Sequence, residues 1–145
     1  MTGSPLVIDA SVAAKWINPE VHSVYAEQIL QGPYRLLAPD LLWPEVGNIL
    51  WKSAQRQEIT TVEAHEGLRT LLRYPITVVS SRSLITTALE IALQYHQTVY
   101  DCLYIALATT RDCQLVTADS PLHSGLKNTS LQDHILWIED VPTQN

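Results

Sequence analysis

Residues 5–12 read Pro-Leu-Val-Ile-Asp-Ala-Ser-Val, a short apolar run that ends in a polar turn. A run of this length that stops at a turn is typical of a buried strand. Residues 11–17 have the length and composition of a short helix, which we expect to stop near Pro19 because proline cannot continue it. The stretch therefore predicts a strand that leads directly into a helix, with Asp9 at the junction.

The rest of the chain repeats this alternation. We expect further strands at residues 35–38, 76–79, 114–118 and 135–139, and helices at residues 21–30, 40–57, 61–74, 83–95, 98–111 and 120–126. Asp40 is expected to cap the helix that it precedes, with Pro44 in the first turn, where a missing N–H does little harm. Strands that alternate with helices imply an α/β fold in which helices cover both faces of a parallel sheet.

Length and charge restrict the possible functions. The chain has 145 residues, of which 46% are hydrophobic, so we expect a single domain over residues 1–145 with a substantial core. Its net charge of -6 argues against a protein that holds nucleic acid by a broad basic surface. A nuclease whose positive charge is local, or comes from a metal ion, stays possible.

The two cysteines indicate the compartment. Cys102 and Cys113 are eleven residues apart, which on one helix separates them by about 16 Å, whereas a disulfide needs Cα atoms within about 7 Å. We therefore predict free thiols in a reducing compartment. No signal peptide is visible, and no stretch approaches the roughly 20 apolar residues that a membrane helix requires. These features predict a cytoplasmic protein without a membrane partner.

Four acids stand where a parallel sheet would bring them together. In such sheets, the site lies beyond the carboxyl ends of the strands, where the strand order reverses. Asp9 ends the first predicted strand and Asp119 follows the fourth, while Glu45 and Asp101 lie near the start of long helices. Three of the four are flanked by apolar residues, where an unpaired carboxylate is costly. Magnesium or manganese would offset that cost, since both prefer hard oxygen ligands.

Each acid also has a purely structural interpretation. Asp9 and Asp119 could cap the helices that follow them, although a nearby serine could also cap the first of these. Thr98 and Asp101 match a capping box, with aspartate in place of the usual glutamate or glutamine. Glu45 could simply face the positive end of its helix dipole. Capping does not require four acids to meet at one sheet edge, so the complete set favours a shared site.

A polar stripe follows one face of the helix predicted at residues 40–57. It consists of Glu45, Asn48, Lys52 and Arg56, spaced by three or four residues. The stripe is either a solvated face or one wall of a polar cleft, and asparagine and lysine favour the cleft because they suit phosphate contacts. Lys15 is a further candidate for phosphate contacts, and surface solubility or ion pairing is the alternative for each basic residue.

Four segments, in this order, resemble the PIN-domain ribonucleases and most closely the VapC-type toxins of bacterial toxin–antitoxin pairs. They are Asp9-Ala10-Ser11-Val12 with Lys15 and Trp16, Pro44-Glu45-Val46-Gly47-Asn48, Tyr100-Asp101-Cys102-Leu103-Tyr104-Ile105-Ala106-Leu107-Ala108, and Val116-Thr117-Ala118-Asp119. Each motif is short and permissive, whereas the ordered set is specific and spans nearly the whole chain. Cys102 and Leu122 depart from the alanine and phenylalanine that are common in the family, but neither is a proposed ligand.

The resemblance implies a three-layer α/β/α fold around a mostly parallel sheet. It also implies a site whose acids hold one or two Mg²⁺ or Mn²⁺ ions and carry out catalysis: Asp9, Glu45, Asp101 and Asp119, supported by Ser11, Asn48 and Thr117. The protein would then be a metal-dependent endoribonuclease, with Lys15, Lys52 and Arg56 as candidates for RNA contacts. A structured RNA substrate, a cognate antitoxin and a homodimer are implied by the family alone.

Two other functions compete with this hypothesis. A magnesium-dependent phosphatase of similar fold commonly has Asp-x-Asp after its first strand, with the first aspartate as nucleophile. The sequence here is Asp9-Ala10-Ser11, which argues against that reaction. A non-catalytic α/β binding module, whose acids merely cap helices, would bind no metal.

Overall fold

The computed structural model describes residues 3–21 and 23–142, and its centre is one sheet of five parallel strands. The strands are β1 (Ser4–Ile8), β2 (Tyr34–Pro39), β3 (Ile76–Val79), β4 (Gln114–Thr117) and β5 (Ile135–Trp137). They lie in the order β3-β2-β1-β4-β5, so the order reverses between β1 and β4. The parallel sheet that the alternating pattern predicted is confirmed.

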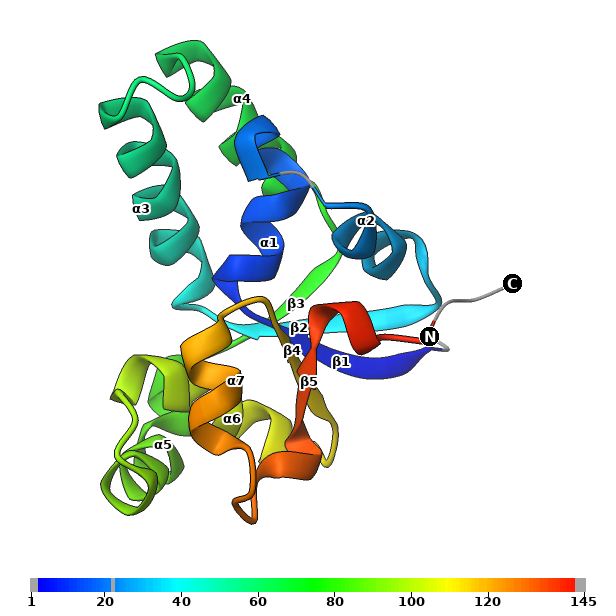
Figure 1. Ribbon diagram of the computed structural model, residues 1–145, viewed down its shortest axis with the longest axis vertical. Helices are drawn as coiled ribbons and strands as arrows, with labels where there is room; N and C mark the ends of the chain where they lie inside the picture. The colour runs from blue at the N-terminus through cyan, green and yellow to red at the C-terminus, as the bar shows by residue number, and fades with distance from the viewer. Residues whose placement is uncertain (1–2, 22, 143–145) are drawn as a thin grey trace.

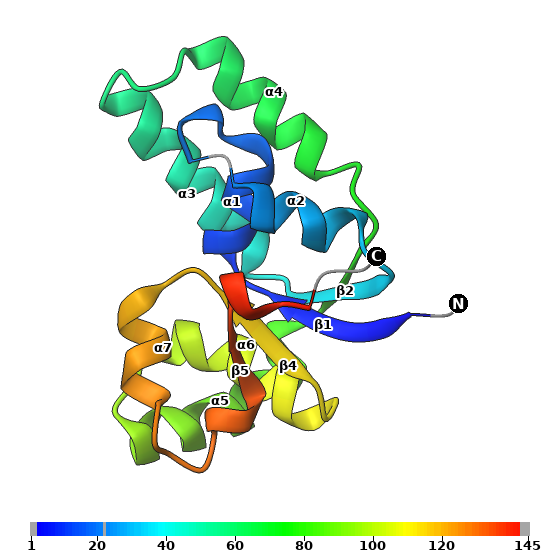
Figure 2. The ribbon, with the colours of Figure 1, turned by 45° about the vertical axis from the view of Figure 1, so that its right-hand side comes forward.

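Helices cover both faces of the sheet (Figure 1). On one side lie α1 (Ala10–Ile17), α2 (Val24–Gln31), α3 (Leu42–Gln55) and α4 (Thr61–Leu71). On the other side lie α5 (Ser81–Tyr95), α6 (Val99–Thr110) and α7 (Ser120–Leu126), as the second view shows (Figure 2). The predicted three-layer α/β/α fold is confirmed.

The core fills the space between these layers. Every residue of α6 from Cys102 to Ala108 is buried, which explains why this helix is almost entirely apolar. On the opposite layer, α4 approaches α1 closely at Gly67, where an added Cβ would lie 3.0 Å from the Ile17 carbonyl oxygen. The absence of a side chain at this position therefore permits the two helices to pack together.

Several predicted boundaries are wrong by two or three residues; the helix expected at residues 61–74, for example, ends at Leu71. The helix expected at residues 21–30 begins at Val24, because the Ser23 hydroxyl caps it and Pro19–Val21 form a separate 3-10 turn. The strand expected at residues 135–139 ends at Trp137, and Ile138–Asp140 form another 3-10 turn. The predicted single domain, 1–145, and the predicted helix at 21–30 include positions 1–2, 22 and 143–145, which lie outside the described residues.

The role predicted for Asp40 is also wrong. Helix α3 has Leu41 at its N-cap and no side-chain capping bond. Asp40 instead accepts a hydrogen bond from the Ser81 N–H at 3.1 Å and another from the Ser81 hydroxyl, and so secures the start of α5. The reason is tertiary: β2 and β3 are parallel neighbours with Pro39 paired to Val79, so the residue after β2 lies beside the start of α5.

Both cysteines are free thiols, as predicted, with Cys102 buried and Cys113 half-buried. None of the helices in the described part of the chain combines the length and the hydrophobicity that crossing a membrane would require.

Candidate active site

Asp9 lies at the reversal point of the strand order. It follows the last residue of β1 and caps α1, accepting a hydrogen bond from the Val12 N–H at 3.1 Å. The capping interpretation is therefore correct for this residue. Capping alone does not explain its burial, however, because only 6% of its surface is exposed.

Two hydroxyl groups connect Asp9 to the end of β4. The Thr117 hydroxyl donates to Asp9 Oδ2 at 2.5 Å and accepts from the Asp119 N–H at 3.0 Å. The Ser11 hydroxyl donates to Asp9 Oδ1 at 2.6 Å and accepts from the Ala118 N–H at 3.0 Å. Asp9 and residues 117–119 thus form one hydrogen-bonded unit, although they are more than a hundred positions apart in the sequence.

Glu45 is positioned by a buried tyrosine on the opposite layer. It lies in the first turn of α3, half-buried, and its Oε1 accepts a hydrogen bond from the Tyr104 hydroxyl at 2.5 Å. Tyr104 is only 2% exposed. Burial and the charge of Glu45 raise the Tyr104 pKa, so the phenol stays protonated and acts as the donor. We assign Tyr104 as the residue that orients Glu45.

Asp101 and Asp119 are both half-buried at helix starts. The Asp101 N–H donates to Thr98 Oγ1 at 3.1 Å, which is one half of the predicted capping box. Asp119 caps α7, accepting from the Leu122 N–H at 3.1 Å through Oδ1. The structural interpretations hold here too, but capping involves only one carboxylate oxygen of Asp119.

Burial raises the pKa of Asp9 to about 6. Hydrogen bonds from Ser11, Thr117 and the Val12 N–H oppose that rise, and the negative charge of Asp119 adds to it. The pKa of Asp9 is raised even though three donors already bond to its carboxylate, so burial disfavours the ionised form more than these hydrogen bonds favour it. At neutral pH, the ionised carboxylate therefore favours a positively charged partner.

The other acids influence one another in the same direction. Burial raises the Asp101 pKa, with a further rise from the charge of Asp119. Burial also raises the Glu45 pKa. The hydrogen bond from the Tyr104 hydroxyl opposes this rise, and the charge of Asp101 adds to it. Since interactions between charges weaken with distance, each of the four acids lies near at least one of the others.

The donor chemistry fits a divalent cation. The acids present only hard oxygen atoms, and the groups that contact Asp9 and Glu45 are neutral hydroxyls and an N–H. A cation would offset both their burial and their mutual repulsion. Within residues 3–21 and 23–142, no three His, Cys, Asp or Glu side chains are already arranged as a metal site. Binding of one metal ion by three of these acids would therefore require their carboxylates to move closer together.

The polar stripe on α3 borders a cleft, and Glu45 is the member of the four acids that lines it. Glu45, Asn48 and Lys52 line a hollow of about 400 Å³, together with Ala10 at the start of α1 and Tyr100 on α6. This favours the cleft interpretation for the first three positions of the stripe. Arg56 is the C-cap residue at the far end of α3, and Lys15 lies in the last turn of α1. Neither of these two side chains lines the hollow.

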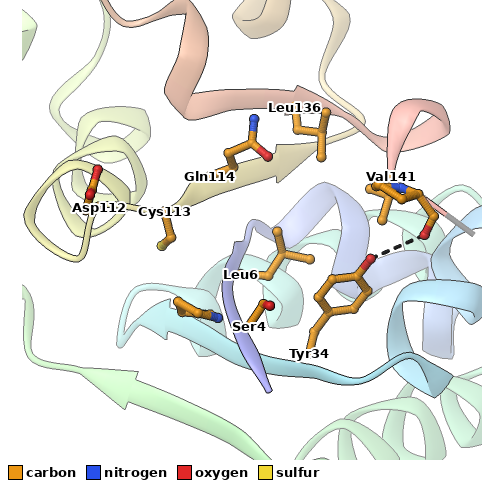
Figure 3. A pocket seen from close by; sticks show the side chains of 10 residues that line it. Ser4, Leu6, Tyr34, Asp112, Cys113, Gln114, Leu136 and Val141 are labelled. Atoms are coloured by element: carbon orange, nitrogen blue, oxygen red, sulfur yellow. Dashed lines mark hydrogen bonds between the residues drawn. The ribbon is translucent and has the colours of Figure 1, made fainter. Parts of the chain in front are cut away.

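A second hollow, of about 490 Å³, lies at the opposite edge of the sheet (Figure 3). It is bounded by the first residues of β1, β2 and β4, including Ser4, Tyr34 and Gln114. The Tyr34 hydroxyl donates to the Pro142 carbonyl oxygen at 3.3 Å across one side of it. None of the predicted site residues reaches this edge, so its larger size does not make it the better candidate.

Sequence reasoning missed two tyrosines at the site, Tyr104 and Tyr100. A signal for Tyr104 was available, because a tyrosine inside an apolar helix needs a partner for its hydroxyl. It lies three residues after Asp101, and therefore on the same face of α6. Tyr100 carries no comparable signal, since its place beside α3 depends on how the two helices meet.

Comparisons with known proteins agree with this geometry. Residues 6–124 match the family model of the PIN domain. Ribonuclease VapC3 of Pyrobaculum aerophilum is 36% identical over 81% of this chain and 91% of its own. The crystal structure of PAE2754 from Pyrobaculum aerophilum has a TM-score of 0.70 at 24% identity, covering 94% of this chain and 85% of that chain.

A toxin–antitoxin complex from Klebsiella pneumoniae shares the fold, with a TM-score of 0.63 at 12% identity over 94% of this chain and 99% of that chain. The family match covers all four motifs on which the predicted resemblance rests, and confirms it. The chain therefore belongs to the PIN domain family.

Proposed function

We propose that the protein is a divalent-metal-dependent endoribonuclease and the toxin of a toxin–antitoxin pair. The observation that carries the proposal is the buried Asp9, whose pKa is raised to about 6 and whose oxygens are bonded to the segment that bears Asp119. Asp101 is close enough to Asp119, and Glu45 to Asp101, for the charge of one acid to raise the pKa of the next. Similarity to Ribonuclease VapC3 supports RNA as the substrate.

In this proposal Asp9, Glu45, Asp101 and Asp119 hold Mg²⁺ or Mn²⁺. When bound, the metal supplies a water of lowered pKa and offsets negative charge on the phosphate. The hydrogen bond from Tyr104 holds Glu45 in place. Ser11 and Thr117 each donate a hydrogen bond to one oxygen of Asp9. Asn48 and Lys52, which line the cleft, contact the RNA backbone. Lys15 and Arg56 contact more distant parts of the substrate.

The competing functions fit the site less well. Asp9 and Asp119 do cap helices, as a non-catalytic module would require. A cap at a helix start is most stable when charged, however, whereas the surroundings of Asp9 disfavour its charge. A phosphatase of similar fold commonly has Asp-x-Asp after its first strand, and Ser11 stands here where the second aspartate would be.

The first prediction is that wild-type protein cleaves structured RNA only when a divalent metal is present. We expect cleavage of a tRNA or ribosomal RNA loop in Mg²⁺ or Mn²⁺, measured by gel electrophoresis of labelled RNA, and none in EDTA. Re-addition of excess metal should restore it. Cleavage that persists in EDTA would contradict the proposal, as would the absence of cleavage of every RNA tested with metal.

An apolar groove between α3 and α4 supports the antitoxin as a partner. It has a volume of about 320 Å³ and is lined by residues that include Leu50, Ala54 and Leu68. Trp51, also on this groove, is 57% exposed. Such a groove suits the apolar face of an amphipathic helix. We propose that the cognate antitoxin occupies it. An antitoxin that binds Trp51→Ala as tightly as wild type would contradict this placement.

A second prediction concerns a homodimer. Ile85, Leu89 and Leu93 form a stripe at four-residue spacing on α5 and are 42%, 48% and 72% exposed. We propose that a second copy covers this stripe, because exposed apolar side chains at such spacing favour helix pairing. Light scattering should therefore show a dimer for wild type and a monomer for Leu89→Glu. A monomeric wild type, or a Leu89→Glu dimer of equal stability, would contradict it.

The proposed location is the cytoplasm. Two free thiols fit a reducing compartment, and RNA is the proposed substrate. Fractionation of the native host with an antibody to the protein would test this, and enrichment outside the cytoplasm would contradict it.

A further inference from the structure

We propose that Tyr100 is a stacking platform for an unpaired nucleobase next to the phosphodiester that is cleaved. The inference rests on the proposed ribonuclease function and deepens it, because it names the substrate form as single-stranded or looped RNA. Nothing in the acid cluster itself distinguishes single-stranded from duplex RNA, whereas an aromatic platform does.

Tyr100 is exposed although a fully buried segment begins two residues after it. It stands immediately before Asp101 in the first turn of α6, yet 63% of its surface is exposed, while the residues from Cys102 to Ala108 are buried. No packing in the described part of the chain hides this ring. One exposed aromatic side chain needs no explanation by itself, but a ring that borders the candidate site is available to contact a ligand.

Tyr100 also lines the cleft that the polar stripe of α3 borders. Tyr100 lines the hollow of about 400 Å³ that contains Glu45, Asn48 and Lys52. Two other aromatic residues are strongly exposed, but Trp51 lies in the groove between α3 and α4, and Tyr25 is on α2. Among the exposed large apolar side chains in the described residues, Tyr100 is the one that borders this cleft.

The composition of the cleft matches the parts of a nucleotide. Lys52 supplies a cation for a phosphate, Asn48 supplies an amide for a ribose or base, and Tyr100 supplies a flat surface for the base. Bases in a duplex are stacked on each other and do not present their faces, whereas looped or single-stranded RNA does. Stacking would also add affinity that a chain of net charge -6 cannot obtain from a broad basic surface.

The experiment measures RNA binding by a protein variant that is expected not to cleave the RNA. In the Asp119→Asn protein with Mn²⁺, we expect Tyr100→Ala to weaken binding of a labelled single-stranded RNA by roughly 5- to 150-fold, the range that corresponds to loss of one stacked base. Tyr100→Phe and Tyr100→Trp should restore it, because stacking needs the ring and not the hydroxyl. Tyr25→Ala, at the 41% exposed tyrosine of α2, is the matched control and should bind normally.

Several outcomes would contradict the proposed stacking role of Tyr100. They are unchanged binding by Tyr100→Ala, failure of Tyr100→Phe to restore binding, or an equal loss of affinity for duplex RNA. A change of oligomeric state in Tyr100→Ala, seen by light scattering, would assign the ring to a protein interface instead. Calorimetric titration of Mn²⁺ into Tyr100→Ala without the second substitution should match wild type, and a weaker affinity would assign the effect to the metal site.

The ribonuclease proposal and the proposal for Tyr100 can be contradicted by different results. If wild type cleaves RNA with metal but Tyr100→Ala binds RNA normally, only the platform is wrong. If wild type with metal cleaves no RNA, the ribonuclease proposal itself is wrong and the platform falls with it.

Discussion

Asp101→Asn is expected to lower metal-dependent RNA cleavage by about 100- to 1,000-fold, which corresponds to roughly 3–4 kcal/mol of transition-state stabilisation. The substitution keeps the shape of the side chain and leaves the N–H donor to Thr98 in place. It removes one negative charge from the set that would bind the metal. Cleavage rates at saturating RNA, over a range of Mn²⁺ concentrations, would measure the effect.

The matched control is Asp112→Asn. Asp112 has a positive φ of 50°, a conformation that asparagine also tolerates, and its exposed carboxylate lies at the far edge of the sheet. This variant loses the same unit of charge and should keep full activity. The role of Asp101 would be refuted by a variant with more than about a third of wild-type activity, or by an equally inactive Asp112→Asn.

Asp9→Asn is expected to stabilise the metal-free protein at neutral pH while abolishing activity. The folded pKa of about 6 lies above the ordinary aspartate value of 3.8, so this carboxyl contributes fully to stability below pH 3.8 and loses that contribution as pH rises through 6. Asparagine has no charge to bury. In EDTA, the difference in unfolding free energy between the variant and wild type should therefore shift in favour of the variant by about 2 kcal/mol from pH 4.5 to pH 7.5.

Urea denaturation at the two pH values would measure this difference, with Asp112→Asn as the control for loss of an exposed charge. Asparagine lacks one acceptor oxygen for the Thr117 hydroxyl. This loss lowers the unfolding free energy of the variant by about 1 kcal/mol at both pH values. Saturating Mn²⁺ should reverse the order, because only wild type gains binding free energy in the folded state. A variant whose stability relative to wild type is the same at both pH values would disprove the buried-charge explanation.

The fold and the acids were predictable because they depend on short-range sequence patterns. An apolar run followed by Asp9, and another followed by Asp119, placed two acids at the carboxyl ends of parallel strands. The rule that sites form where the strand order reverses then brought them together. The observed order confirms that reversal between β1 and β4.

The errors and omissions arise where tertiary contacts override local pattern. Asp40 looked like a helix cap, but the pairing of β2 with β3 gives it Ser81 as a partner. Tyr104 looked like one more apolar residue of α6, although its hydroxyl reaches Glu45 on the other layer of the fold. Tyr100 could be found only after the position of α3 was known. Each case needed the arrangement of neighbouring elements in space.

The bond from Thr117 to Asp9 has a consequence for how the protein is made. The central strand β1 is made long before its neighbour β4 and the acid Asp119, which follow it by more than a hundred residues. A nascent chain that has not reached β4 lacks one of the four acids and also the hydroxyl that holds Asp9 Oδ2. The proposed site therefore cannot assemble until synthesis has passed residue 119, more than a hundred residues after Asp9 has been made.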